Sequence, residues 1–156
     1  MNTHDILRQE LLALLRGGNA HLGFDDAIAE FPVEVINQRP PDFPYTPWQL
    51  VEHMRIAQWD ILEFMRNARH VSPSWPEGHW PPAGEEADPL RWVATVNAFQ
   101  ADLQALQDLV SDPDTDFFAP IPHAPAYTIL REILLAADHN AYHMGELGVL
   151  RQLVAR

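Results

Sequence analysis

The chain has 156 residues, of which 47% are apolar, and this fits one folded domain over residues 1–156 with a single core. Its formal net charge of −12, from 22 acidic and 10 basic side chains, repels nucleic-acid phosphates and anionic lipid headgroups, so we expect neither as a partner. Because the chain has no cysteine, it has no disulfide framework, and any metal ion must be held by His, Asp, Glu or backbone oxygens.

The first predicted helix covers residues 3–16, where leucine and isoleucine side chains form an apolar stripe and Gly17 and Gly18 follow as a stop signal. The segment MNTHDILRQELLALLRGG has no basic n-region and carries charges among its leucines, which indicates an amphipathic helix and not a signal peptide. No run of about 18 apolar residues occurs in the chain, so no membrane span is predicted. We therefore expect a soluble cytoplasmic protein.

A shorter helix is predicted at residues 24–31, before Pro32, and the segment NQRPPDFPYTP, with four prolines in eleven residues, cannot continue it. The second long helix begins at a capping box. Thr46 is its N-cap, Pro47 suits the first helical position, and Gln49 completes the T-x-x-Q pattern. This helix is predicted to continue to about residue 68.

The segment VSPSWPEGHWPPAGEEADP then forms a long loop that is rich in proline and aromatic residues. Asp88 as N-cap and a proline after it predict a third long helix over residues 89–111. After another proline-rich loop, Thr128 caps a fourth helix that runs to about residue 155. Four long helices without an alternating strand pattern predict an all-α four-helix bundle with long proline-rich connecting loops. Loops of this length favour a crossover connection.

Two histidines, His139 and His143, lie four residues apart in LLAADHNAYHMGELGVLRQL on the last helix. They project from one helix face, one turn apart, so both imidazoles can reach a single transition-metal ion. Their face is largely apolar, and we expect both rings to point into the bundle. The alternative is a pair of core histidines that are satisfied by hydrogen bonds.

His53 is the candidate for a third ligand. It stands in the middle of the second long helix, within LVEHMRIAQW, on a core-facing stripe. Alone, such a histidine is more often a packed, hydrogen-bonded residue than a ligand. The chain contains neither E-x-x-H nor H-E-x-x-H, which argues against the di-iron and zincin arrangements. A three-histidine site with open coordination positions remains, as in catalytic zinc or nickel sites.

The segments YTPWQLVEHMRIAQWDILEF and AADHNAYHMGELGVLRQL, with NAHLGFDDAIAEFP and HVSPSWPEGHWPP outside these helices, resemble the DinB-like (YfiT-related) metalloenzyme family over nearly the whole chain. The resemblance implies a four-helix bundle, often a homodimer, with a divalent transition metal held by His53, His139 and His143. Members with known activity are similar to thiol-dependent transferases and isomerases that use bacillithiol or mycothiol. A small-molecule substrate, such as a low-molecular-weight thiol, is therefore expected.

Three neutral imidazoles leave the charge of a divalent ion uncompensated, so a bound water or thiol would lose its proton near neutral pH. Helical spacing makes three carboxylates candidates for orienting an imidazole or moving a proton: Asp60, Glu132 and Glu146. The alternative for each is a solvated or capping carboxylate.

We expect a divalent-metal-dependent enzyme, either a thiol-dependent transferase or a hydrolase of a small substrate. One alternative is a non-catalytic metal-binding or stress-response protein in which the dimer matters more than chemistry. The other is a bundle whose histidines are polar core residues and bind no metal.

Four aromatic side chains lie in or beside the proline-rich loops: Tyr45, Trp48, Trp75 and Trp80. They could wall the mouth of a pocket, although packing of the loops onto the bundle is the favoured interpretation. His21 is interpreted as a surface-loop residue. The remaining histidines have no supporting context: His4, His70, His79 and His123.

Overall fold

The structure is a computed structural model and describes residues 2–155. Its helices are α1 (Thr3–Arg16), α2 (Phe24–Ile28), α3 (Pro47–Arg66), α4 (Pro89–Ser111) and α5 (Ile129–Val154), with 3-10 turns η1 (Val33–Val35) and η2 (Glu77–His79). Two short antiparallel strands, β1 (Pro120–Ile121) and β2 (Ala124–Thr128), precede α5. The predicted all-α four-helix bundle is confirmed.

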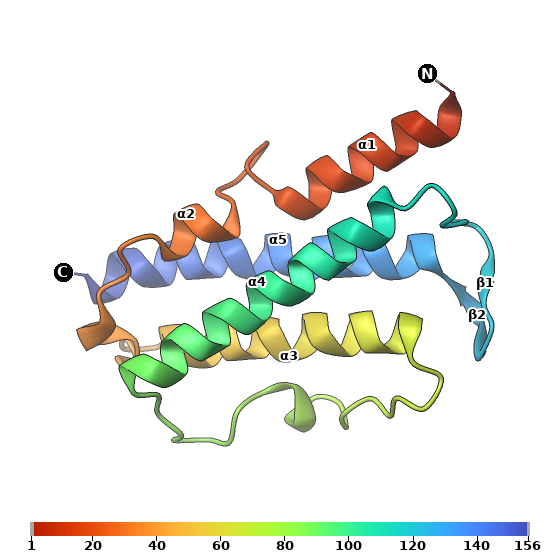
Figure 1. The fold of residues 1–156 in the computed structure, drawn as a ribbon. Helices are drawn as coiled ribbons and strands as arrows, with labels where there is room; N and C mark the ends of the chain where they lie inside the picture. Colours follow the sequence, from red (N-terminus) through yellow and green to blue (C-terminus); the bar gives the residue numbers. More distant parts are fainter. Residues whose placement is uncertain (1, 156) are drawn as a thin grey trace.

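The four long helices α1, α3, α4 and α5 pack side by side (Figure 1). Helices α3 and α4 run in the same direction, and α1 and α5 run in the opposite one (Figure 1). The connection from α3 to α4, residues 67–88, must therefore return along the length of the bundle before α4 can begin. This segment, called the crossover loop below, is the predicted crossover connection.

Local signals position the starts of the long helices as predicted. The Thr46 side chain accepts a hydrogen bond from the Gln49 amide, and the Gln49 side chain accepts one from the Thr46 amide, which closes the capping box of α3. Asp88 caps α4, and Thr128 caps α5. These caps set the register of the two helices that carry the predicted histidines, α3 and α5.

Two local predictions were wrong. Helix α2 ends at Ile28 and not at residue 31, because Ala29 is extended and Glu30 adopts a positive φ of 52°. The sequence analysis also missed the β1–β2 pair, whose strands of two and five residues are too short to give an alternating pattern. Within residues 2–155, no helix is long and apolar enough to cross a membrane.

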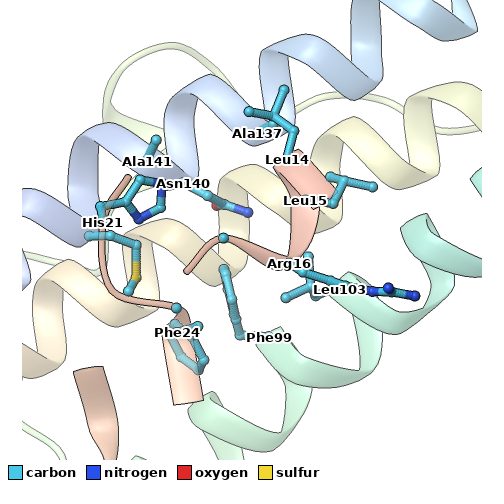
Figure 2. Close-up of a pocket in the computed structure, with 13 residues that line it drawn as sticks. Leu14, Leu15, Arg16, His21, Phe24, Phe99, Leu103, Ala137, Asn140 and Ala141 are labelled. Carbon is cyan, nitrogen blue, oxygen red and sulfur yellow. The ribbon is translucent and has the colours of Figure 1, made fainter. Parts of the chain in front are cut away.

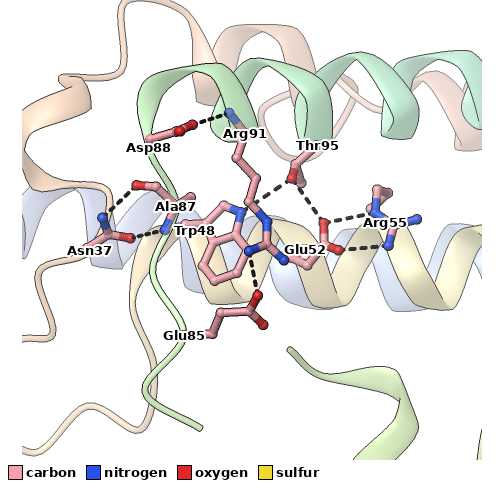
Figure 3. A network of polar contacts seen from close by, with 9 residues as sticks. All are labelled: Asn37, Trp48, Glu52, Arg55, Glu85, Ala87, Asp88, Arg91 and Thr95. Atoms are coloured by element: carbon pink, nitrogen blue, oxygen red, sulfur yellow. Dashed lines mark hydrogen bonds and ion pairs between the residues drawn. The ribbon is translucent and has the colours of Figure 1, made fainter. Parts of the chain in front are cut away.

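A polar network joins α3 to α4 beside one of the predicted histidines (Figure 3). Glu52 accepts two hydrogen bonds from Arg55, at 2.8 and 2.7 Å, and a third from the Thr95 hydroxyl at 3.0 Å. The Trp48 indole N–H donates to Thr95 at 3.3 Å. Because His53 follows Glu52 directly, this network fixes the rotation of the α3 turn that presents His53.

Candidate metal centre

Three histidine side chains converge between α3 and α5. The Nε2 atom of His53 lies 3.0 Å from Nε2 of His143 and 3.0 Å from Nε2 of His139. One nitrogen from each ring lies within 4.8 Å of the others. His53 and His143 are buried, and His139 is partly buried. The structure therefore brings together the three residues that the sequence analysis proposed as ligands.

The hydrogen bonds of the other ring nitrogens define the tautomers of two of these rings. His53 Nδ1 lies 2.7 Å from the backbone oxygen of His79, and His143 Nδ1 lies 2.6 Å from Oε2 of Glu146. Both partners are acceptors, so each Nδ1 carries a proton, and in the neutral form that binds a metal each ring presents a lone pair at Nε2. Two lone pairs that face each other at 3.0 Å repel unless a cation lies between them.

The spacing of the nitrogens fits a transition-metal ion. Two imidazole nitrogens about 2.05 Å from one ion are about 2.9 Å apart at an angle of about 90° and about 3.3 Å apart at the tetrahedral angle. The observed separations of 3.0 Å fall in this range. The three histidines could therefore hold a divalent ion. Within residues 2–155, no further His, Asp or Glu joins the group.

Burial favours the neutral, metal-binding form of two of these rings, His53 and His139. Desolvation lowers the pKa of His53 from 6.5 to about 4, although its hydrogen bond to the His79 carbonyl opposes part of this shift. Desolvation and, after it, the charges of the neighbouring histidines together lower the pKa of His139 to about 3. The Nδ1 atom of His139 is buried and has no hydrogen-bond partner among the described residues.

A comparison with protein families bears on this geometry. The model of the DinB superfamily matches residues 8–147, which include all three histidines. The chain belongs to the DinB superfamily. No curated protein and no solved structure matches it. The family assignment agrees with the resemblance seen in the sequence and with the helical fold.

Aromatic side chains from two loops cover the candidate centre of this DinB superfamily protein. Trp80 stacks on the His53 ring with centroids 3.9 Å apart and an interplanar angle of 1°. Tyr45 stacks on Trp80 with centroids 4.8 Å apart, and burial, followed by the nearby Glu146 carboxylate, raises the pKa of its hydroxyl. Tyr45 and Trp80 therefore lie against the candidate centre, whereas the favoured interpretation of the sequence was that they only pack the loops onto the bundle. Trp48 is a core residue, and Trp75 is 71% exposed.

The three candidate carboxylates occupy different positions. Glu146 contacts the histidine group directly through His143. Asp60 reaches it only indirectly, because its oxygens bind Nε2 of His70 at 2.7 Å and Nε2 of His79 at 3.1 Å. Glu132 makes its hydrogen bond to Arg131, away from the three histidines, and is buried rather than solvated. Burial raises the pKa of Glu132.

The sequence did not reveal two contributions to the site. His79 orients His53 through its backbone carbonyl, and a backbone acceptor leaves no trace in residue type. His70 and His79 both bind Asp60, but they lie in the crossover loop, where no helical period relates them to α3. His21 is partly exposed and lines a small cavity with Asn140, and His4 and His123 are exposed.

Proposed function

We propose that this DinB superfamily protein is a divalent-metal-dependent enzyme in which His53, His139 and His143 hold the ion, with zinc or nickel as the best candidates. The observation that carries the proposal is the 3.0 Å approach of Nε2 lone pairs whose tautomers are set from the other side of each ring. When bound, such an ion supplies the charge that lowers the pKa of a coordinated thiol or water.

The residues around the three histidines have roles that follow from their contacts. The His79 carbonyl and the Glu146 carboxylate hold two rings by Nδ1, so both Nε2 atoms face the centre without rearrangement. Trp80 covers one face of the His53 ring and excludes water from that side. Asp60 positions His79 and thereby the carbonyl that orients His53.

The proposed reaction is transfer of a low-molecular-weight thiol, with hydrolysis of a small substrate as the second candidate. Because the chain has no cysteine, the thiol must come from the substrate. The alternative role is that of a non-catalytic metal-binding or stress-response protein. A structural site is closed by a fourth protein ligand, whereas no fourth His, Asp or Glu joins the group within residues 2–155. This difference favours the enzyme.

The homodimer stays a prediction, which sedimentation velocity tests.

Metal content tests the ligand assignment. The protein is stripped with a chelator, reloaded with Zn²⁺ or Ni²⁺, desalted and measured by elemental analysis. We expect one ion per chain in the wild type and in the control His4→Ala, which removes an exposed histidine. His143→Ala is expected to retain its helix content by circular dichroism and to lose the ion. Equal metal content in the two variants contradicts the assignment.

The thiol reaction is tested separately with Co²⁺-loaded protein. A low-molecular-weight thiol that reaches the ion is expected to add the near-ultraviolet absorption typical of cobalt–thiolate bonds. If metal binds but no thiol adds this band, thiol transfer is excluded, and turnover of small esters and amides becomes the next measurement.

A further inference from the structure

A pocket lies between the C-terminal half of α3 and the first turns of α5. Its volume is about 220 Å³. The residues that matter for its chemistry are Asp60, Phe64, Tyr127, Arg131, Glu132 and Leu135. We call it the α3–α5 pocket.

The α3–α5 pocket shares a seam of the bundle with the three histidines. Asp60 follows His53 by seven residues on α3, and Glu132 precedes His139 by seven residues on α5. Seven residues are close to two helical turns, so each pair lies on one helix face, about 10.5 Å apart along the axis. Leu135 lines the pocket and lies four residues, about one turn, before His139 on α5.

Glu132 gives this pocket a hydrogen-bond acceptor at its wall. The residue is only 2% exposed. Its hydrogen bond from Arg131, at 2.6 Å, uses Oε1, and within residues 2–155 no donor reaches Oε2. The oxygens of Asp60, in contrast, are already bound by His70 and His79. Oε2 of Glu132 is not fully shielded from solvent, so it can accept a hydrogen bond from a group that enters the pocket.

The charge and the walls of the pocket indicate which donor it suits. Arg131 compensates one of the two carboxylates, Asp60 and Glu132, and no other lysine or arginine lines the pocket. The aromatic rings of Phe64 and Tyr127 pack edge to face, with centroids 5.5 Å apart, and the Arg131 guanidinium lies 5.0 Å from the Tyr127 centroid. A carboxylate beside aromatic rings suits an ammonium group better than a neutral hydroxyl or a carboxylate.

We propose that the α3–α5 pocket binds the ammonium group of a small substrate whose thiol end reaches the three histidines. This inference rests on the proposed function and adds the substrate class, an aminothiol in which nitrogen and sulfur are separated by about 10 Å, the distance set by two helical turns. An independent amine site is the competing interpretation, and it predicts no dependence on this separation.

The test measures dissociation constants of linear thiols from the cobalt–thiolate band of Co²⁺-loaded protein. The probes are ω-aminoalkanethiols of increasing length, with ω-hydroxyalkanethiols and ω-carboxyalkanethiols of the same lengths as neutral and anionic controls. We expect the aminothiol to bind about tenfold more tightly than the hydroxythiol when its span is near 10 Å, because it adds a charge-assisted hydrogen bond. We expect no preference for the two-carbon probes.

Variants test whether Glu132 causes the preference for aminothiols over hydroxythiols. Glu132→Gln is expected to reduce the affinity for aminothiols of the preferred span to that for hydroxythiols of the same length. The control Glu10→Gln removes the same charge from an exposed position on α1 and is expected to keep the preference. Tyr127→Lys places a cation in the pocket from a 41% exposed position, so it tests the same prediction if Glu132→Gln does not fold.

The two proposals fail in different ways. If no probe produces the cobalt–thiolate band, the proposed thiol chemistry is overturned, and this inference falls with it. If the band forms but the aminothiols show no advantage at any length, this inference alone is overturned. Tighter binding of carboxythiols, an advantage that does not depend on length, or an advantage that survives in Glu132→Gln also overturns it.

Discussion

At the residue scale, the Nδ1 atoms of His53 and His143 each donate a hydrogen bond that orients the ring, but the two acceptors differ in kind. The His79 carbonyl is part of the backbone and survives any substitution at that position, whereas the Glu146 carboxylate is a side chain that can be replaced. Glu146 is therefore the position where the orientation of a ring can be tested by mutation.

Glu146→Leu is expected to lower metal affinity about 10- to 100-fold, because the His143 ring loses the acceptor that fixes its tautomer. Glu146→Gln retains an acceptor oxygen and is expected to lose less. Competition with a chromophoric chelator measures both constants, and Glu86→Leu, at an exposed carboxylate, is the control. An affinity for Glu146→Leu within twofold of the control would show that Glu146 does not orient the ligand.

A buried amide pair leads to a second prediction at this scale. Gln58 Nε2 donates to the backbone oxygen of Phe99 at 2.8 Å, so its Oε1 must accept from Asn140 Nδ2, also at 2.8 Å. This order leaves Asn140 Oδ1 buried without a partner among the described residues. Asn140 and Phe99 line a cavity of about 20 Å³, drawn in Figure 2.

That cavity has room for one water molecule, and Asn140 Oδ1 needs a donor. We expect a high-resolution crystal structure to show an ordered water within hydrogen-bond distance of this oxygen. A cavity free of density, with the Asn140 amide in the same orientation, would contradict this expectation.

At the element scale, the crossover loop contributes as much to the candidate centre as a helix does. It supplies the His79 carbonyl and the Trp80 ring, which contact His53 at its edge and on its face. The starts of α3, α4 and α5 could be predicted because capping signals are local. The path of the loop could not, because it depends on contacts between residues far apart in the sequence, such as His79 with Asp60.

Metal binding is expected to slow amide hydrogen exchange in residues 77–80. An ion that fixes the His53 ring also stabilises the loop contacts on its other side, by thermodynamic linkage. Trp80→Ala should reduce this protection and lower metal affinity, whereas Trp75→Ala, at a 71% exposed ring, should change neither. Exchange followed by mass spectrometry, with and without Zn²⁺, measures the effect. If Trp80→Ala and Trp75→Ala show equal protection, the loop is not coupled to the metal centre.

At the scale of the whole molecule, the sequence was sufficient for the bundle and for the three-histidine group. Helical periodicity predicts the bundle and places His139 and His143 on one face and His53 on a core-facing stripe, and the family resemblance implied that the three form one group. The sequence was not sufficient for the roles of the carboxylates. Glu132 and Asp60 have the same two-turn spacing from a histidine, yet one pairs with Arg131 and the other binds two loop histidines. Spacing along one helix does not specify which side chains the neighbouring helices and loops place beside a carboxylate.

The net charge of −12 and the buried histidines act in opposite directions when the metal-free protein is acidified. Protonation of carboxylates reduces the self-repulsion of the native state. The pKa of His53 is about 4 and that of His139 about 3 in the native state, against about 6.5 for a histidine in the unfolded chain. Between pH 6.5 and these values the unfolded chain binds protons that the native state does not, so these rings lower stability as the pH falls.

The neutral His53 and His139 rings contribute fully to the free energy of unfolding above pH 6.5, and this contribution is lost progressively as the pH falls below that value. We therefore expect the free energy of unfolding of chelator-treated protein, measured by urea denaturation from pH 7.5 to 5, to fall more steeply in the wild type than in His53→Gln. The difference in slope is limited to about 1.4 kcal/mol per pH unit for each proton. His4→Gln, at an exposed histidine, should retain the wild-type slope. Because all three proteins share the same background of carboxylates, parallel curves for wild type and His53→Gln would mean that His53 is not held neutral by burial.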